Sequence, residues 1–243
     1  DGLTQWYEGP LGRLLAQAEQ TELDNILPNL FGYHLLQVGV SGHSLMSASR
    51  ILHKVVMETG HDGQLAGEEE QGQLFGQAEA LPITSDSLDA VLLYHLLEFS
   101  SDPRQLLREV DRVLVPEGHL VILGFNPYSF WGMRRILNFK KSSIPWCGKF
   151  ISLMRLKDWL ALLGFEVCSC RHIFFRPPIQ SEGVVSKFQF MESWGRRCCP
   201  IFGGVYVLVA KKKVSTMTPI KPRWRPRRSV VSGLADTASR TRG

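Results

Sequence analysis

Residues 76–127 read GQAEALPITSDSLDAVLLYHLLEFSSDPRQLLREVDRVLVPEGHLVILGFNP and contain the most regular pattern of secondary structure in the chain. A continuous apolar run over 89–94 is typical of a parallel strand that is buried on both faces. A helix over 103–114 follows, because an Asp-Pro pair begins it and leucines and valines at helical spacing form its inner face. A Pro-Glu-Gly turn then leads into a strand over 119–125. Strand, helix and strand in this order indicate a βαβ unit and a parallel sheet.

The sequence on either side of this unit continues the alternation of helices and strands. Apolar spacing predicts helices over 10–27, 43–52 and 156–163, and strands over 33–38, 54–57, 165–175 and 204–210. Residues 59–72 are polar and are expected to form a loop. The last two strands have no helix between them, which predicts an antiparallel pair at the edge of the sheet.

Composition narrows the class of protein. The 243 residues are 44% hydrophobic and 21% charged, which suits one α/β domain and excludes a coiled coil, a collagen or a disordered chain. The apolar stretches are too short to cross a bilayer, and no charged-then-apolar signal opens the chain, so we expect a cytoplasmic protein. Five cysteines without a C-x-x-C pattern favour reduced structural thiols over a metal site or a disulfide framework.

The net charge of +5 conceals two regions of opposite sign. Residues 211–243 carry ten Lys and Arg against one acid, whereas residues 1–210 carry 18 basic and 22 acidic side chains. We therefore expect a slightly acidic body and a basic tail that has too few apolar residues to fold alone. The predicted organisation is an N-terminal helical extension (1–32), one domain (33–210) and the tail (211–243).

The first strand-to-helix turn is the first candidate binding site. In an open parallel sheet, ligands bind beyond the carboxyl ends of the strands, and the turn Gln37-Val38-Gly39-Val40-Ser41-Gly42-His43-Ser44 lies at such an end. Gly39 and Gly42 could let the backbone approach a ligand closely. A glycine pair at a strand end is equally compatible with a plain turn.

Residues 76–127 resemble the class I S-adenosylmethionine-dependent methyltransferases, specifically the type 11 small-molecule branch that includes the ubiquinone and menaquinone C-methyltransferases. The resemblance extends over about residues 33–210, and four elements carry it in order: GQAEALP at 76–82, the Asp-Ala-Val strand at 89–91, Arg-Val-Leu at 112–114 and Pro-Glu-Gly at 116–118. It implies a Rossmann-like α/β fold, with a seven-stranded, mostly parallel sheet, an antiparallel last strand and helices on both faces. It also implies S-adenosyl-L-methionine as the cofactor.

The chain departs from the first motif of this family, which reads acid-x-Gly-x-Gly-x-Gly. Only Gly39 keeps its place, because Gln37 replaces the acid, Ser41 and His43 replace the other two glycines, and Gly42 is offset by one position. The resemblance implies that Gln37 can contact the methionyl ammonium of the cofactor only as a hydrogen-bond acceptor. Ser41 and Gly42 are expected to lie beside the methionyl group.

Three further positions match cofactor contacts of the family. Gln77 stands where an Asp accepts a hydrogen bond from the adenine amino group, and Ala78 follows it; the amide keeps an acceptor oxygen. Glu58 lies about twenty residues after the glycine turn, at the distance of the ribose-binding acid. A solvated loop glutamate is an equally good reading of Glu58.

Tyr94 and His95 lie at the end of the fourth strand. In this family the end of that strand forms the wall of the methyl-transfer chamber and contacts the cofactor, so the resemblance makes both residues candidates for the site. Both are candidate catalytic residues. His95 would be a general base, or a polar residue that lines the pocket; the first role requires a carboxylate that orients it, and Glu98 is one candidate. Asn126, in an Asn-Pro-Tyr sequence after the fifth strand, could be part of the pocket wall.

Residues 128–150 occupy the position of the substrate lid in this family. Their aromatic, Arg and Lys side chains could cover a planar or anionic substrate, stack on bases or lie on a membrane surface, and an amphipathic helix with a solvated basic face is the alternative. Trp224 and the arginines of the tail could contact RNA or anionic lipid, or form a flexible solubilising tail.

The leading hypothesis is methyl transfer from S-adenosylmethionine to a small-molecule acceptor. A methyltransferase fold that has lost catalysis and serves as a binding or scaffold protein would explain the altered first motif. An RNA methyltransferase would explain the basic tail. A nicotinamide-dependent oxidoreductase is the least supported, because Ser41 and Ser44 stand where G-x-G-x-x-G requires glycines. The sequence contains no metal-binding motif, and methyl transfer does not require one.

Overall fold

A computed structural model describes residues 2–39, 45–58, 72–137, 144–178, 192, 195 and 197–213. The helices are α1 (Gly2–Tyr7), α2 (Pro10–Ile26), η1 (Leu27–Asn29), α3 (Pro103–Val113), α4 (Phe130–Leu137), α5 (Leu153–Leu162) and η2 (Pro200–Phe202). The strands are β1 (His34–Gly39), β2 (His53–Glu58), β3 (Gly72–Phe75), β4 (Leu88–Tyr94), β5 (Leu114–Phe125), β6 (Phe165–Ile173) and β7 (Val205–Lys212).

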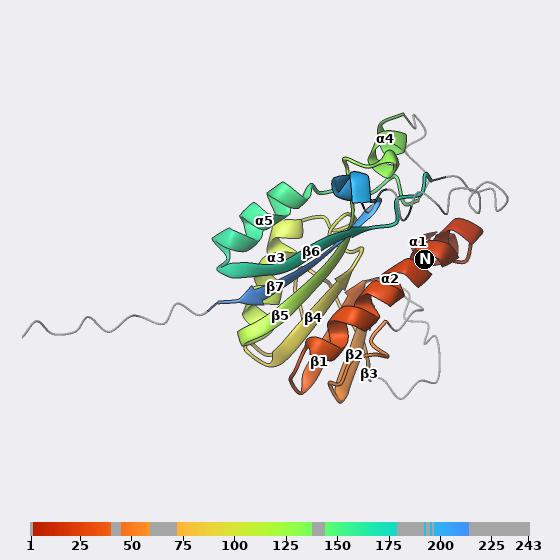
Figure 1. Cartoon of the computed structure of the whole chain (residues 1–243). Helices are drawn as coiled ribbons and strands as arrows, with labels where there is room; N and C mark the ends of the chain where they lie inside the picture. Colours follow the sequence, from red (N-terminus) through yellow and green to blue (C-terminus); the bar gives the residue numbers. More distant parts are fainter. Residues whose placement is uncertain are drawn as a thin grey trace, which may run out of the picture.

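The seven strands form one sheet in the order β3-β2-β1-β4-β5-β7-β6 (Figure 1). The strands from β1 to β5 run parallel to their neighbours, and β7 is antiparallel to both β5 and β6. The chain reverses its direction of winding between β1 and β4, which is the topological switch point of such a sheet. The predicted fold class, a mostly parallel seven-stranded sheet with an antiparallel last strand, is confirmed.

Helices cover both faces of the sheet, as predicted (Figure 1). Because successive side chains of a strand point to opposite faces, Leu35 and Leu92 belong to the core under α2, whereas Leu36 and Val91 belong to the core under α3 and α5. The α2 core includes three leucines of that helix, and the opposite core includes the inner stripes of α3 and α5. The N-terminal helices are therefore part of the packed domain.

The helix predicted over 43–52 is wrong for the described part of that range. Residues 45–52 form turns and extended chain, and residues 43 and 44 lie outside the described residues. Serine side chains compete with helical hydrogen bonds, and here the hydroxyl of Ser49 accepts from the backbone N–H of Ile51 at 3.2 Å. Leu45, Met46 and Ile51 are buried in the α2 core, so packing holds this segment without a helix.

Four other elements differ from the expected ones. Helix α1 and strand β3 were not predicted, because each is too short to show a periodic pattern. Strand β5 begins at Leu114, before the predicted start at residue 119. Strand β7 extends to Lys212, so the first two lysines of the predicted tail belong to the sheet. Among the helices in the described ranges, none is long and apolar enough to span a bilayer.

Candidate active site

Three of the predicted site residues lie at the carboxyl edge of the sheet. In the strand register, Gly39 of β1 pairs with Glu58 of β2 on one side and with Tyr94 of β4 on the other, and Glu58 pairs with Phe75 of β3. Because parallel strands end at the same edge, the register brings Gly39, Glu58, Tyr94 and the start of the loop after β3 into one row. This is the edge at which such sheets bind ligands.

Gly39 has a backbone conformation and a surrounding that require glycine. Its φ is 145°, and a Cβ at this position would lie 2.2 Å from the carbonyl oxygen of Tyr94. The end of β1 therefore approaches the end of β4 more closely than any side chain permits. This close contact explains why position 39 keeps the glycine of the family motif.

Gln37 is fully buried near the end of β1. Its Oε1 accepts a hydrogen bond from the backbone N–H of Leu45 at 3.1 Å, so the amide ties Leu45 to the strand. The predicted contact of Gln37 with the cofactor stays a prediction. Ser41 and Gly42 lie outside the described residues.

Glu58 ends β2 with its side chain half-buried. Its backbone oxygen accepts from the N–H of Gly76 at 3.4 Å, which joins β2 to the loop that holds Gln77 and Ala78. Within the described part of the chain, the Glu58 carboxylate makes no hydrogen bond. Gln77 is exposed and Ala78 is buried. A carboxylate, an exposed amide and a small apolar residue thus lie in sequence along this part of the edge.

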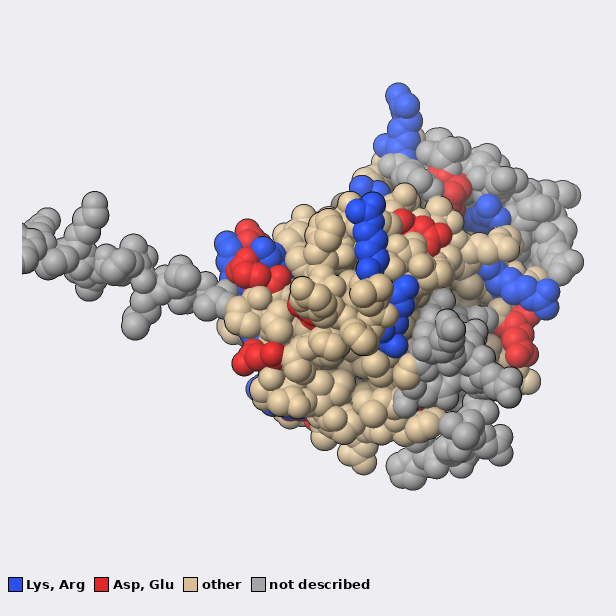
Figure 2. All heavy atoms as spheres, turned by 90° about the horizontal axis from the view of Figure 1, so that it is seen from below, with Lys and Arg blue, Asp and Glu red and all other residues tan. Residues whose placement is uncertain are grey.

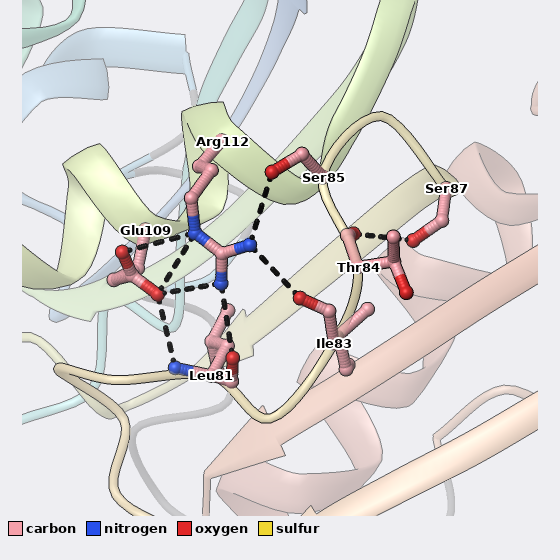
Figure 3. A network of polar contacts seen from close by, with 7 residues as sticks. All are labelled: Leu81, Ile83, Thr84, Ser85, Ser87, Glu109 and Arg112. Atoms are coloured by element: carbon pink, nitrogen blue, oxygen red, sulfur yellow. Dashed lines mark hydrogen bonds and ion pairs between the residues drawn. The ribbon is translucent and has the colours of Figure 1, made fainter.

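The loop after β3 is anchored to helix α3 by two charged side chains (Figure 3). The guanidinium of Arg112 donates to the carbonyl oxygens of Ile83 and Leu81, each at 2.9 Å, and its Nη2 pairs with Glu109 at 2.8 Å. Glu109 in turn accepts from the backbone N–H of Leu81 at 3.1 Å. The pair lowers the pKa of Glu109, chiefly through the hydrogen bond from Arg112. This network fixes the segment that directly follows Gln77 and Ala78.

Replacing the guanidinium should loosen this loop. We expect Arg112→Lys to lower the free energy of unfolding by about 1–2 kcal/mol, because an ammonium cannot span the two carbonyls and the carboxylate together. We also expect about a tenfold weaker binding of S-adenosylhomocysteine in isothermal titration calorimetry. Arg108→Lys, on the exposed side of the same helix, is the control and should change neither quantity. Equal behaviour of the two variants would contradict a role for the network in holding the loop.

A carboxylate from helix α2 is buried at the end of β4. Glu19 is fully buried, and its two oxygens contact three side chains: Tyr94 Oη donates to Oε2 at 2.8 Å, Tyr7 Oη donates to Oε2 at 3.1 Å, and His95 Nε2 lies 2.7 Å from Oε1. Tyr7 belongs to α1. The N-terminal helices therefore place two polar side chains directly on the predicted catalytic pair.

The electrostatics of this cluster favour a charged imidazole. Burial opposes the charge, but the charge of Glu19 and its hydrogen bond, with a smaller contribution from Glu98, raise the pKa of His95 to about 9. Burial and the same carboxylate raise the pKa of Tyr7 and of Tyr94 well above their usual value. At neutral pH the cluster is thus an imidazolium held by a carboxylate between two neutral tyrosines. A histidine in this state cannot accept a proton.

Glu98 binds the backbone rather than the imidazole. Its Oε1 accepts from the N–H of Phe125 at 2.6 Å and lies 3.7 Å from His95 Nδ1, beyond hydrogen-bond distance. His95 Nδ1 is buried and has no hydrogen-bond partner among the described residues. The carboxylate that orients the histidine is therefore Glu19. Glu98 is closer to His95 in the sequence, but Glu19 is closer to it in the structure.

The sequence contained one signal that could have identified Glu19. It lies four residues after Leu15 and four before Leu23, on the apolar stripe of α2, where an acid is not expected without a buried partner. Asn126 is buried, and its place in the pocket wall stays a prediction. Its Nδ2 donates to the carbonyl oxygens of Ile201 and Gly203, at 2.7 and 2.9 Å, and thereby joins the end of β5 to η2.

Comparison with known proteins identifies the family. The model of a family described as a methyltransferase domain matches residues 36–122. An uncharacterized Escherichia coli protein, YafS, is 31% identical over 219 residues, which cover 89% of this chain and 84% of that protein. The chain belongs to the class I S-adenosylmethionine-dependent methyltransferases.

Solved structures of methyltransferases share the fold of this methyltransferase. One is the methyltransferase in a complex with the Trm112 methyltransferase activator from Haloferax volcanii, with a TM-score of 0.61 and 16% identity over 88% of this chain and 99% of that one. Another is a methyltransferase from Archaeoglobus fulgidus, with a TM-score of 0.56 and 21% identity over 80% and 93% of the two chains. At these identities the likeness shows the fold alone.

S-adenosylmethionine is the cofactor of this methyltransferase, and the described residues fit its nucleoside half. The unpaired carboxylate of Glu58 suits a ribose diol, and the exposed amide of Gln77 can accept from an adenine amino group. Gly39 lies beside Glu58 in the strand register. The family model begins at residue 36, so Glu19 and Tyr7 lie outside the matched region although they contact the candidate catalytic residues.

Proposed function

We propose that this methyltransferase methylates a small organic acceptor that lies beyond the end of β4, between that strand and residues 126–150. The observation that carries the proposal is the row at the sheet edge, in which Glu58, Gly39 and Tyr94 pair in register. Glu58 would hold the ribose and Gln77 with Ala78 the adenine. The bound cofactor supplies a methyl group that its sulfonium already activates, so the protein has mainly to align the acceptor and exclude water.

Aromatic side chains support an acceptor site at this place. Phe125 lies 4.2 Å from His95 between ring centroids, and the rings of Trp131 and Phe150 stack on Phe125 at 5.7 and 5.2 Å. Phe125 and Trp131 are themselves buried, so an acceptor that reached this cluster would meet an apolar environment, which favours an apolar or planar acceptor over a hydrated one. Whether the acceptor is a quinone-like ring, as in the branch that the sequence resembles, stays a prediction.

The charge distribution at the start of the tail favours a small molecule over RNA. Lys211 pairs with Glu117, Lys212 with Asp86 and Asp111, and Lys213 with Glu166. Figure 2 shows the resulting mixture of basic and acidic side chains where the chain leaves the domain, on a surface that is otherwise largely uncharged. Lysines that already have carboxylate partners contribute little to phosphate binding.

Removing the carboxylate at the end of β2 should weaken cofactor binding without a loss of stability. We expect Glu58→Ala to raise the dissociation constant of S-adenosylhomocysteine at least about tenfold, because a charged hydrogen bond contributes about 1.5–3 kcal/mol. Stability should change little, since this carboxylate has no partner in the described part of the chain. The control is Glu166→Ala in β6, which removes a surface ion pair at the other edge of the sheet. Unchanged affinity would show that Glu58 is a solvated residue.

The acceptor class can be tested with a labelled methyl group. The protein is incubated with S-adenosylmethionine that carries a radiolabelled methyl group, in one arm with a small-molecule cell extract and in the other with total RNA. We expect label in the low-molecular-weight fraction, and less of it with Glu58→Ala. Label in RNA that depends on the protein would contradict a small-molecule acceptor and favour the RNA methyltransferase hypothesis.

A further inference from the structure

Helix α4 presents apolar side chains to solvent. The helix buries Trp131 and Gly132 against the aromatic cluster below it. On its outer side, the exposed fractions are 42% for Phe130, 50% for Met133, 76% for Ile136 and 65% for Leu137. A surface helix of a globular domain carries polar residues on its outer side, so this arrangement is reversed. An exposed apolar stripe of this kind marks an interaction site.

The stripe continues onto η2. The side chain of Asn126, just before α4, donates to the carbonyl oxygen of Ile201 at 2.7 Å, so the start of α4 and η2 lie side by side. Ile201 and Phe202 of η2 are 63% and 51% exposed. We define the α4–η2 face by its seven exposed apolar residues, Tyr128, Phe130, Met133, Ile136, Leu137, Ile201 and Phe202. Figure 1 shows α4 at the end of the molecule that lies beyond the carboxyl edge of the sheet.

The segment that contains α4 carries charges of one sign in the sequence. Residues 126–150 contain five Lys and Arg and no acid. The two arginines of α4 are half-buried: Arg134 lies 4.2 Å from the ring of Trp146, and Arg135 lies 5.5 Å from the ring of Phe150. The charged side chains of α4 are therefore basic only.

We propose that the α4–η2 face docks on the surface of an anionic lipid bilayer. The seven apolar side chains would enter the boundary between headgroups and acyl chains, and the arginines of α4 would contact lipid phosphates. A helix with an apolar side and an exclusively basic polar side is typical of membrane-surface binding. The proposal goes beyond the proposed function and does not depend on the acceptor.

The test is co-sedimentation of the full chain with lipid vesicles. One set of vesicles is phosphatidylcholine alone, and the other contains about one third phosphatidylglycerol, which gives a negative surface. The double variant Met133→Glu with Ile136→Glu removes the centre of the face. Leu162→Glu is the matched control, because Leu162 is 85% exposed but lies on α5. Binding of S-adenosylhomocysteine and the melting temperature, which should be alike in all three proteins, show that the variants are folded.

We expect the unmodified chain and Leu162→Glu to bind the anionic vesicles and to bind phosphatidylcholine alone much more weakly. The double variant should bind at least about tenfold more weakly, because two exposed apolar side chains no longer enter the bilayer. Equal binding by the double variant, or no binding by the unmodified chain, would overturn the proposal. A dimer that the double variant dissociates, in the absence of vesicle binding, would also overturn it and would assign the face to a second copy of this chain. Cofactor binding is measured separately, so failure here is distinguishable from failure of the proposed function.

Discussion

Replacing Glu19 by Gln should lower the free energy of unfolding by about 3 kcal/mol below pH 6.5, and this loss should shrink as the pH approaches 9. The reason is the pKa of His95, which is about 9 in the folded protein and about 6.5 in an unfolded chain. A folded-state pKa that is raised adds stability that is fully present below the unfolded value and is lost as the pH rises through the folded value. Glu19→Gln removes the charge that raises it. Urea unfolding at several pH values between 6 and 9.5 measures how the free energy of unfolding depends on pH in the variant and in the unmodified chain.

The control for this prediction is Glu22→Gln on the same helix. Glu22 pairs with Arg171 at 3.1 Å, but the arginine is largely exposed, so the loss should be below about 1 kcal/mol and nearly independent of pH. Tyr7→Phe removes one of the hydrogen bonds to Glu19 and should cost about 1 kcal/mol without changing the pH slope. If Glu19→Gln and the unmodified chain lose stability in parallel as the pH rises, His95 is not a cation held by Glu19.

The second large effect is expected at the end of β1. Gly39→Ala should lower the free energy of unfolding by about 3 kcal/mol and the melting temperature by about 10 °C, because the new Cβ would overlap the Tyr94 carbonyl at a φ that disfavours side chains. Cofactor binding should fall with it, since β1 and β4 must separate at the edge that carries the site. Thermal unfolding and titration with S-adenosylhomocysteine measure the two effects.

Gly72→Ala is the matched control for this glycine. Gly72 begins β3, two strands away in the same sheet, and a Cβ there would meet only a methyl group of Val55 at 3.6 Å. We expect this variant to be as stable as the unmodified chain or slightly more so, because alanine restricts the unfolded chain. A Gly39→Ala protein as stable as Gly72→Ala would contradict the close approach of β1 to β4.

Much of the sheet could be predicted from the sequence because most of its strands can be recognised from the pattern of their own residues. The apolar run at 89–94 and the helix after it each carry a complete pattern, and the resemblance implied a seven-stranded, mostly parallel sheet with an antiparallel last strand. The helix predicted over 43–52 failed because apolar spacing does not reveal that serine hydroxyls and core packing hold that segment in turns. The position of Lys212 in β7 was equally hidden, since its partners, the backbone oxygens of Asp111 and Leu114, are about a hundred residues away in sequence.

The candidate site was predicted in part. Gly39 follows from the rule that ligands bind at strand ends, whereas Glu58 and Tyr94 follow from the family resemblance; the register places all three in one row. Glu19 could not be assigned, because its three partners come from α1 and from the end of β4, the latter more than seventy residues away. A pattern within one helix shows that an acid is buried there but does not show what it contacts.

The central claim is that this chain binds S-adenosylmethionine at the carboxyl edge of β1, β2 and β3, despite its altered first motif. The most direct measurement is isothermal titration of the unmodified full chain with S-adenosylhomocysteine, which binds the same site without turnover. We predict one site with a dissociation constant on the order of micromolar, weakened by Glu58→Ala and unaffected by Glu166→Ala. No detectable heat at ligand concentrations of about a millimolar would contradict the claim and would favour a methyltransferase fold that serves as a binding or scaffold protein.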